Sequence, residues 1–324
     1  MLTLLVIGVQ MGVQVGVLSG LQLGALSAAS ARQPADAAGK PPADAPFVTR
    51  LTHTVNAYGC WSPDASTIVF QSNCTGRWQL YTIAADGTNL RPLLNSPGND
   101  ITPVYSPDGS KILFVSERDG NREVYICNAD GTNQRNISRD PAMDIHPSWS
   151  HDGTRLLFSS NRGNKDPDDY DIYEMNVDGS NVRRVTSGPE IDTYASWSPD
   201  GKRIVTRRVI DGKTNNEVFV MNADGSGAVN LTKAPEHYDG WPVWSPDGTK
   251  ICFAGGGPDV GNHYLFLINP DGTGKRQLTF AWLAGSSHCY DTQPAFSPDG
   301  RRIVFTRYRP ATHFESAELC VLEI

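Results

Sequence analysis

The chain has 324 residues and a mass of 35.3 kDa, enough for one large or two ordinary domains with a buried core. Hydrophobic residues make up 39% of it, which excludes wholesale disorder and a multi-span membrane protein. The 35 acidic and 28 basic residues give a net charge of −7, which argues against a nucleic-acid binder because such a protein needs a basic face. The 31 glycines and 22 prolines favour a turn-rich all-β chain.

The N-terminus has the features of an export signal. No charged residue precedes Arg32, residues 2–7 are strongly apolar, and Ala29-Ser30-Ala31 provides the small-x-small pattern that signal peptidase accepts. We therefore predict a signal peptide over residues 1–31 and an exported protein, periplasmic or secreted. Residues 32–46 are rich in Ala and Pro and predict a flexible linker.

An alternative for the same segment is a retained membrane anchor. A glycine recurs at every fourth position, at Gly8, Gly12, Gly16, Gly20 and Gly24. On a helix these glycines would form a smooth ridge suited to helix–helix contact in a bilayer, and the uncharged stretch is long enough to span one. In that case alone the protein would contact the membrane.

Internal repeats dominate the rest of the sequence. A turn motif recurs at intervals of 44 to 52 residues, within the range of a four-stranded propeller blade. Its copies are Ser62-Pro63-Asp64-Ala65, Ser106-Pro107-Asp108-Gly109, Ser150-His151-Asp152-Gly153, Ser198-Pro199-Asp200-Gly201, Ser245-Pro246-Asp247-Gly248 and Ser297-Pro298-Asp299-Gly300. Pro presets φ, Asp accepts bonds from backbone N–H groups and Gly takes positive φ, as a tight hairpin turn requires.

These repeats predict a six-bladed β-propeller over residues 47–324. A second turn with Asp-Gly follows each of the first five motifs, so each repeat provides four strands, A to D. The sixth repeat ends after its third strand, which we place at residues 318–322. Residues 48–52 match the end of a fourth strand, and we expect this N-terminal strand to complete the last blade and close the ring.

The repeat resembles that of a known family. The six Ser-Pro-Asp-Gly turns, the Asn-x-Asp-Gly turns and strand ends such as Leu231-Thr232 and Leu278-Thr279 are similar to the WD-like repeats of the TolB-type six-bladed propeller family. The resemblance covers residues 47–324. It implies the propeller fold, periplasmic residence and contacts with other proteins.

The position before each turn serine is aromatic in all six repeats. Stacking platforms are one interpretation, but large aromatic side chains dominate buried area, so we predict wedges of the core between blades. The residues are Trp61, Tyr105, Trp149, Trp197, Trp244 and Phe296.

Five positions before each aromatic residue stands an acidic or amide residue, which we expect nearest the central axis. The six are Asn56, Asp100, Asp144, Asp192, Asp239 and Asp291. Each of them caps its own inter-blade loop, or together they share a cation. Calcium or magnesium would suit such a ring of hard oxygen ligands.

Two residues further on, the repeats diverge. Because the scaffold does not determine this position, we predict that its side chains bind the ligand at the channel mouth: Tyr58, Thr102, His146, Tyr194, Trp241 and Gln293. Four histidines near the ring are candidate ligands of a transition metal; the alternative is that they are ordinary loop residues. They are His53, His146, His237 and His288.

The D–A and B–C connections share one face of the disc, and long variable loops on a rigid frame commonly carry binding sites. We predict that this is the functional face. The long B–C loops are expected at Asn161–Tyr170, Arg207–Asn216, Gly255–His263 and Arg307–Ser316. Cys74 and Cys289, in loops of adjoining blades, are the candidate disulfide pair.

Two functions fit these patterns. The first is an exported, monomeric, non-catalytic binding or scaffold module that grips a protein, peptide or glycan at the channel mouth; no G-x-S-x-G or H-E-x-x-H motif occurs. The second is a metal-dependent lyase or hydrolase acting on a saccharide there. Some similar propellers, the oligogalacturonate lyases, hold a metal with histidines in that place.

Overall fold

The computed structural model describes residues 48–52, 55–210, 215–256, 261–280, 290–308 and 317–324. The predicted signal segment and linker lie outside these ranges. Within them every element of regular structure is a β-strand, and we find no helix with the length and apolar character needed to cross a membrane.

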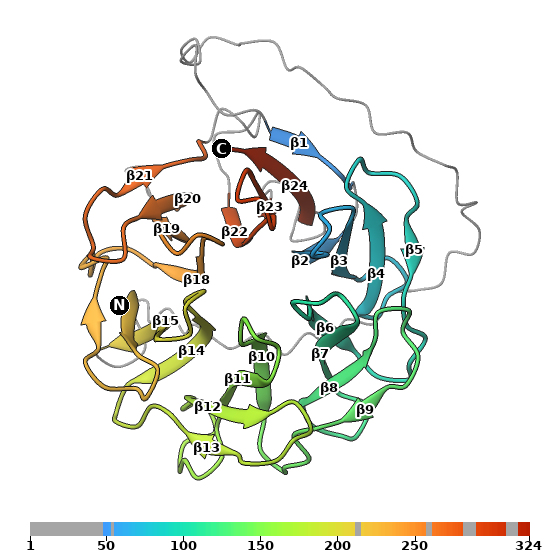
Figure 1. The fold of residues 1–324 in the computed structure, drawn as a ribbon, viewed down its shortest axis with the longest axis horizontal. Helices are drawn as coiled ribbons and strands as arrows, with labels where there is room; N and C mark the ends of the chain where they lie inside the picture. Colours follow the sequence, from blue (N-terminus) through green and yellow to red (C-terminus); the bar gives the residue numbers. More distant parts are fainter. Residues whose placement is uncertain (1–47, 53–54, 211–214, 257–260, 281–289, 309–316) are drawn as a thin grey trace, which may run out of the picture.

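The strands form six blades around a central opening, as predicted (Figure 1). Strands β2, β6, β10, β14, β18 and β22 of the successive blades face that opening, and the short fourth strands lie at the outer edge. Blades 1 to 3 consist of β2 (Asn56–Trp61), β3 (Thr67–Ser72), β4 (Gln79–Ala84), β5 (Arg91–Pro92); β6 (Asp100–Tyr105), β7 (Lys111–Ser116), β8 (Glu123–Asn128), β9 (Arg135–Asn136); and β10 (Asp144–Trp149), β11 (Arg155–Ser160), β12 (Asp171–Asn176), β13 (Arg183–Arg184). Blades 4 to 6 consist of β14 (Ile191–Trp197), β15 (Arg203–Ile210), β16 (Asn215–Asn222), β17 (Val229–Asn230); β18 (Gly240–Trp244), β19 (Ile251–Gly256), β20 (His263–Ile268), β21 (Arg276–Gln277); and β22 (Tyr290–Phe296), β23 (Arg302–Tyr308), β24 (Ala317–Glu323), β1 (Val48–Arg50).

The N-terminal strand closes the ring, which confirms the prediction. Strand β1 pairs antiparallel with β24, with Val48 opposite Leu322, and Leu51 N–H donates to the Leu319 carbonyl at 2.8 Å. The last blade therefore joins the two ends of the propeller, and its inner strands are not left with an open edge. Blades 5 and 6 are further joined by a parallel bridge between His263 and Tyr290.

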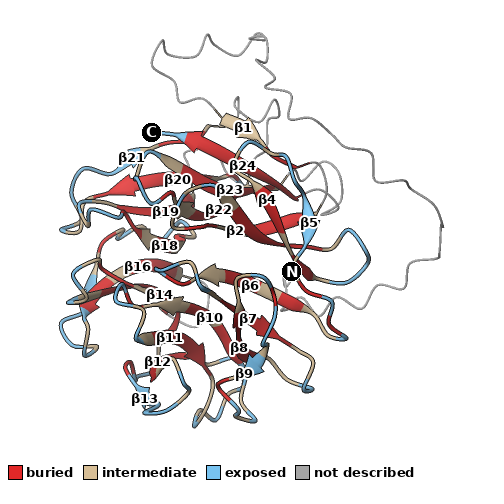
Figure 2. Ribbon diagram, turned by 45° about the vertical axis from the view of Figure 1, so that its right-hand side comes forward, coloured by how far each residue is buried: buried red, intermediate tan, exposed pale blue. Residues whose placement is uncertain are grey.

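The hydrophobic core lies between blades. One cluster contains Val205 and Val218 of blade 4 together with Trp244 and Phe253 of blade 5. Each of the six aromatic residues before a turn serine belongs to such a cluster or packs against one, so their role as core wedges is confirmed. Burial is concentrated in the inner three strands of each blade, and the exposed positions gather in turns and at the outer edge (Figure 2).

The repeated turn has the chemistry that its sequence predicts. In blade 2, the Ser106 hydroxyl donates to Asp108 Oδ1 at 2.6 Å, and the same oxygen accepts the Ser110 N–H at 3.0 Å. These bonds, with that of Ser106 first, lower the pKa of Asp108 to about 2. Gly109 has φ +73°. The corresponding Ser–Asp hydrogen bond is present in all six turns.

Three predicted B–C loops are shorter than expected. Strand β15 continues to Ile210, so Arg207, where we predicted the start of a loop, belongs to a strand. The adjacent pair Arg207 and Arg208 is polar enough to resemble a loop in the sequence, but the two side chains lie on opposite faces of this strand. Strands β19 and β23 likewise run to Gly256 and Tyr308.

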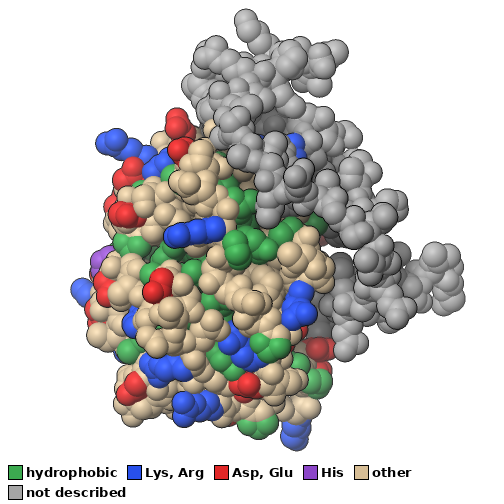
Figure 3. Space-filling model, turned by 90° about the vertical axis from the view of Figure 1, so that its right-hand side faces the viewer, with side chains coloured by type: hydrophobic (Ala, Val, Ile, Leu, Met, Phe, Trp, Pro, Cys, Tyr) green, Lys and Arg blue, Asp and Glu red, His purple; other side chains and the backbone are tan. Residues whose placement is uncertain are grey.

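The face of the molecule shown in Figure 3 carries charges of both signs. Acidic and basic side chains are interspersed there with small hydrophobic areas. The net charge of −7 is therefore not gathered on that side.

The glycines of the two turns differ in their surroundings, which gives a stability test. A Cβ at Gly225, φ +88°, would lie 2.1 Å from the Val185 carbonyl oxygen of the preceding blade, whereas one at Gly201, φ +69°, meets nothing within 4 Å. We expect Gly201→Ala to lower the free energy of unfolding by about 1 kcal/mol, the cost of left-handed backbone. Gly225→Ala should cost at least twice as much, because the Val185 backbone must also move. Urea unfolding measures both; equal losses would contradict the inter-blade contact.

Candidate binding site in the central channel

A bulge in the innermost strand of every blade positions the side chains on the axis. In each of these strands the register with its neighbour shifts directly after the ring of Asp and Asn residues, for example between Ile145 and Ser148. One residue in each bulge takes left-handed backbone. These residues are Tyr58 (φ 55°), Thr102 (50°), His146 (51°), Tyr194 (57°), Trp241 (51°) and Gln293 (55°), the six predicted channel residues.

This conformation is unfavourable for every one of them. Left-handed backbone costs an L-residue about 1–2 kcal/mol, and it is rare for a β-branched residue such as Thr102. Glycine would remove the cost, yet none of the six positions is a glycine. The side chains therefore contribute something at the axis that outweighs the strain.

The six side chains form a layer across the channel, which we call the channel layer. The hydroxyl groups of Tyr58 and Tyr194, from the opposite blades 1 and 4, lie 3.2 Å apart. His146 stacks on Tyr194 with ring centroids 3.7 Å apart, and Trp241 lies 5.7 Å from Tyr194. Tyr58 and Tyr194, the tyrosine pair, thus meet across the axis.

Burial keeps Tyr58 and His146 uncharged. Desolvation, followed by the neighbouring Tyr194, raises the pKa of Tyr58 well above its usual value. Desolvation, with the nearby charge of Arg207 second, lowers the pKa of His146 well below its usual value. Both of these side chains are therefore neutral at physiological pH.

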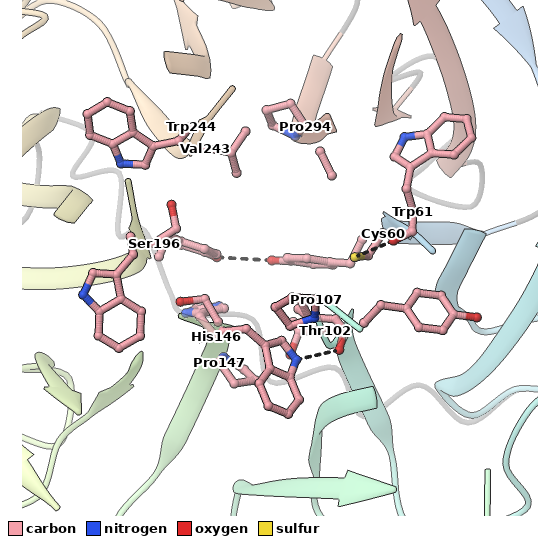
Figure 4. A pocket seen from close by; sticks show the side chains of 18 of the residues that line it. Cys60, Trp61, Thr102, Pro107, His146, Pro147, Ser196, Val243, Trp244 and Pro294 are labelled. Atoms are coloured by element: carbon pink, nitrogen blue, oxygen red, sulfur yellow. Dashed lines mark hydrogen bonds between the residues drawn. The ribbon is translucent and has the colours of Figure 1, made fainter. Parts of the chain in front are cut away.

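A cavity of about 500 Å³ lies on one side of the channel layer. Its wall combines the aromatic wedges, the residues after the bulge and the Ser-Pro-Asp turns, and it is mainly apolar; Figure 4 shows Trp61 and Trp244 on its sides. All six predicted channel residues line it. Cys60, Val104, Ser148, Ser196, Val243 and Ala295 stand between the layer and the turns.

The cavity extends toward the A–B turns, whereas we predicted the functional face on the side of the D–A and B–C connections; that face stays a prediction. The channel residues were identified from their divergence, which says nothing about the direction in which a bulged strand opens. The prolines after the bulge, such as Pro147 and Pro294, were the unused signal, because they recur in four of the six repeats.

The ring carboxylates are held by arginines, an interaction that the sequence analysis missed. The pairs are Asp100–Arg118 at 3.0 Å, Asp144–Arg162 at 2.5 Å, Asp192–Arg208 at 2.8 Å and Asp291–Arg307 at 2.7 Å. An arginine 16 to 18 residues after the aspartate in four repeats was the available signal. In these four blades the side chain accepts from a guanidinium, which corrects the expectation that it caps its loop.

Asp239 of blade 5 is the exception. It is fully buried, and neither of its carboxylate oxygens has a hydrogen-bond partner among the residues that the structure describes. A Cβ at Gly255 would lie 2.2 Å from Asp239 Oδ1, so glycine is needed there. Burial, opposed by the more distant charge of Lys275, raises the pKa of Asp239 to about 6.

The candidate metal ligands are not gathered into one site within the described part of the chain. His146 belongs to the channel layer, whereas His237 is exposed; His53 and His288 lie outside the described residues. Searching these ranges, we find no group of three or more His, Cys, Asp or Glu side chains that could hold a metal ion. The cation site stays a prediction.

The candidate disulfide is not formed. Cys74 is a free thiol whose Sγ lies 3.2 Å from the Tyr81 hydroxyl, and Cys289 lies outside the described ranges. The sequence places both cysteines in loops of adjoining blades, but it does not give the side-chain directions that a disulfide requires.

The raised pKa of Asp239 predicts a pH-dependent stability. In the folded and the unfolded protein alike, this carboxyl is neutral below pH 4, the pKa of an unfolded aspartate. Between pH 4 and 6 it ionises in the unfolded chain but stays mostly neutral in the folded protein, which favours the unfolded state. The stability present in acid is therefore lost between about pH 4 and 6. We expect Asp239→Asn to raise the free energy of unfolding by about 2 kcal/mol at pH 7 and by little at pH 4, measured by urea unfolding.

Asp291→Asn is the matched control, because Asp291 is equally buried but receives two hydrogen bonds from Arg307. Removing its charge leaves the guanidinium without this partner, and we expect a loss of about 3 kcal/mol at pH 7. If Asp239→Asn destabilised the protein as much as Asp291→Asn does, the raised pKa of Asp239 would be contradicted.

Comparison with known proteins agrees with this architecture. Residues 92–281, more than half of the chain, match the family model described as the TolB beta propeller domain. No curated protein matches the sequence.

Among solved structures, the chain is similar to TolB from Acinetobacter baumannii, with 23% identity and a TM-score of 0.62. That match covers 75% of this chain and only 57% of that protein. A putative TolB from Agrobacterium tumefaciens has 20% identity and a TM-score of 0.64, over 84% of this chain and 91% of that chain. An oligogalacturonate lyase in complex with manganese has 15% identity and a TM-score of 0.58, over 86% and 93%. At these identities the structures establish the fold alone, whereas the family match establishes that this chain belongs to the TolB β-propeller domain family.

Proposed function

We propose that this protein is an exported, non-catalytic binding module that holds part of a protein, peptide or glycan partner in the cavity of its central channel. The observation that carries the proposal is the channel layer: six non-glycine side chains kept on strained backbone at the floor of an apolar cavity. A repeat that needed only to fold would not retain this strain.

The cavity has the properties of a binding site. Its volume of about 500 Å³ lies within the range of ligand pockets. Trp and Pro side chains of the wall are rigid, and therefore lose little conformational entropy when a partner docks. Polar groups such as Ser148 and His151 are few and lie near the turns, where they could orient a ligand.

Export rests on the sequence. The apolar, uncharged segment before Arg32 has the character of a signal peptide, and membership of the TolB family agrees with an exported protein. The glycine ridge keeps a membrane anchor as the alternative within the same proposal.

The second function, a metal-dependent lyase or hydrolase acting on a saccharide, would place His53, His146, His237 and His288 around a metal. The likeness to an oligogalacturonate lyase is one of fold. In the described part of the chain, four ring aspartates are already paired with arginines, so no observation there favours this function over binding.

Ala295→Trp tests the proposal, because Ala295 lines the cavity and a tryptophan there would fill much of it. Binders of the full-length protein are selected from a peptide display library and from a glycan array, and their affinities are measured for wild type and variant. We expect the variant to lose at least about tenfold in affinity, about 1.4 kcal/mol.

Val229→Trp, on the exposed outer strand β17, is the control and should leave affinity within about twofold. Circular dichroism verifies that both variants fold. Binders whose affinity is unaffected by Ala295→Trp, or the absence of any binder, would refute the use of this cavity. Turnover of a bound glycan would favour the enzyme.

A further inference from the structure

Arg207 departs from the repeat at a position that faces the channel. It lies on β15 opposite Thr193, the residue before the bulge. The corresponding residues of the other five blades, each opposite the same place in the innermost strand, are Gln71, Val115, Ser159, Ala254 and Thr306. None of these five is charged.

In two of these blades the side chain has a structural role that arginine cannot fill. Gln71 Oε1 accepts the backbone N–H of Thr102 at 2.8 Å, and Thr306 Oγ1 accepts that of Tyr58 at 3.2 Å. In these two blades the side chain thus satisfies the N–H of the bulged residue in the next blade. A guanidinium has donors only, so Arg207 contributes nothing of this kind.

Arg207 is nevertheless held in a defined place. Its Nη1 donates to the Tyr238 hydroxyl at 2.5 Å, and its guanidinium carbon lies 5.0 Å from the ring centroid of Tyr194 and 5.9 Å from that of Tyr238. A Cβ at Gly240 would lie 3.3 Å from Arg207 Cδ. Every other blade has a side chain at the position of Gly240: Ala57, Ile101, Ile145, Thr193 and Thr292. The glycine therefore makes room for the arginine.

The charge of Arg207 has no counter-ion within the described residues. Its neighbour Arg208 pairs with Asp192, and an arginine pairs with the ring aspartate in three other blades as well, whereas Arg207 forms no ion pair in these ranges. Its Nε is buried without a hydrogen-bond partner, and Nη2 donates to no described group. A partly buried guanidinium with free donors beside two tyrosines is a prepared anion site.

We propose that Arg207 anchors the carboxylate at the end of a ligand chain, namely the C-terminal carboxylate of a peptide that enters from the face of the D–A connections. Arg207 precedes the tyrosine pair on that side, and the Tyr58–Tyr194 contact spans the axis beyond it. We therefore expect a chain that reaches Arg207 to end at this contact. The planar guanidinium suits the two oxygens of a carboxylate. This site is separate from the cavity of the proposed function, which lies on the other side of the channel layer.

The test compares N-acetylphenylalanine with its neutral amide as probes of the full-length protein, with binding measured by calorimetry at low salt. We expect the acid to bind wild type at least about tenfold more tightly than the amide. Arg207→Gln should remove that difference. Its effect on the melting temperature of the free protein should be small, because the loss of the hydrogen bond to Tyr238 is offset by the removal of a partly buried charge that has no ion-pair partner in the described residues.

Lys202→Gln is the matched control: it removes one positive charge from an exposed A–B turn on the opposite face and should leave the preference for the acid intact. Equal binding of acid and amide, or a preference that survives Arg207→Gln, would overturn the proposal. So would a response to galacturonate but not to the peptide-like acid. A large fall in melting temperature for Arg207→Gln would show that the arginine is structural.

Discussion

The arrangement at the axis depends on one backbone constraint, the left-handed residue in the bulge of each innermost strand. The same constraint recurs in all six blades. It places six side chains, whose identity the scaffold does not fix, at one level of the channel. The bulge also places the cavity wall, because each strand resumes its register only at the residues that line that wall. Fold and site therefore share the same feature of the chain.

The pairing of buried charges is the second constraint on the structure of the channel, and the charges that remain unpaired mark its unusual sites. Four blades pair a buried aspartate with an arginine that lies in the next strand or just after it, which offsets the desolvation of both ions. In blades 4 and 5 two charges stand outside this scheme, Asp239 without an arginine and Arg207 without a carboxylate. They do not neutralise each other, because Arg207 is turned to the hydroxyl of Tyr238, the residue next to Asp239.

The sequence predicts the fold well because the fold is written six times. The turn motifs and the strand spacing recur in every repeat, and the strand at residue 48 supplies the one that the last repeat lacks. A single ambiguous repeat therefore does not change the predicted fold. It also predicts the six channel residues, since divergence within a repeat marks a position that the scaffold does not fix. It does not predict that Arg207 lies in a strand, because an isolated departure from the repeat resembles a loop until the register is known.

The same limit explains why the sequence did not predict a cavity on the side of the A–B turns. Loop length is visible in a sequence, whereas the direction in which a channel widens depends on bulges and on the packing of side chains such as Trp61 and Trp244. The tyrosine pair then separates two environments that the repeat alone cannot distinguish: an apolar cavity toward the turns and an unpaired guanidinium toward the D–A connections. A ligand that satisfied both would have to part Tyr58 from Tyr194. Losing one hydroxyl–hydroxyl hydrogen bond costs about 1 kcal/mol, a small part of the free energy of ordinary binding, so the two sites need not be independent.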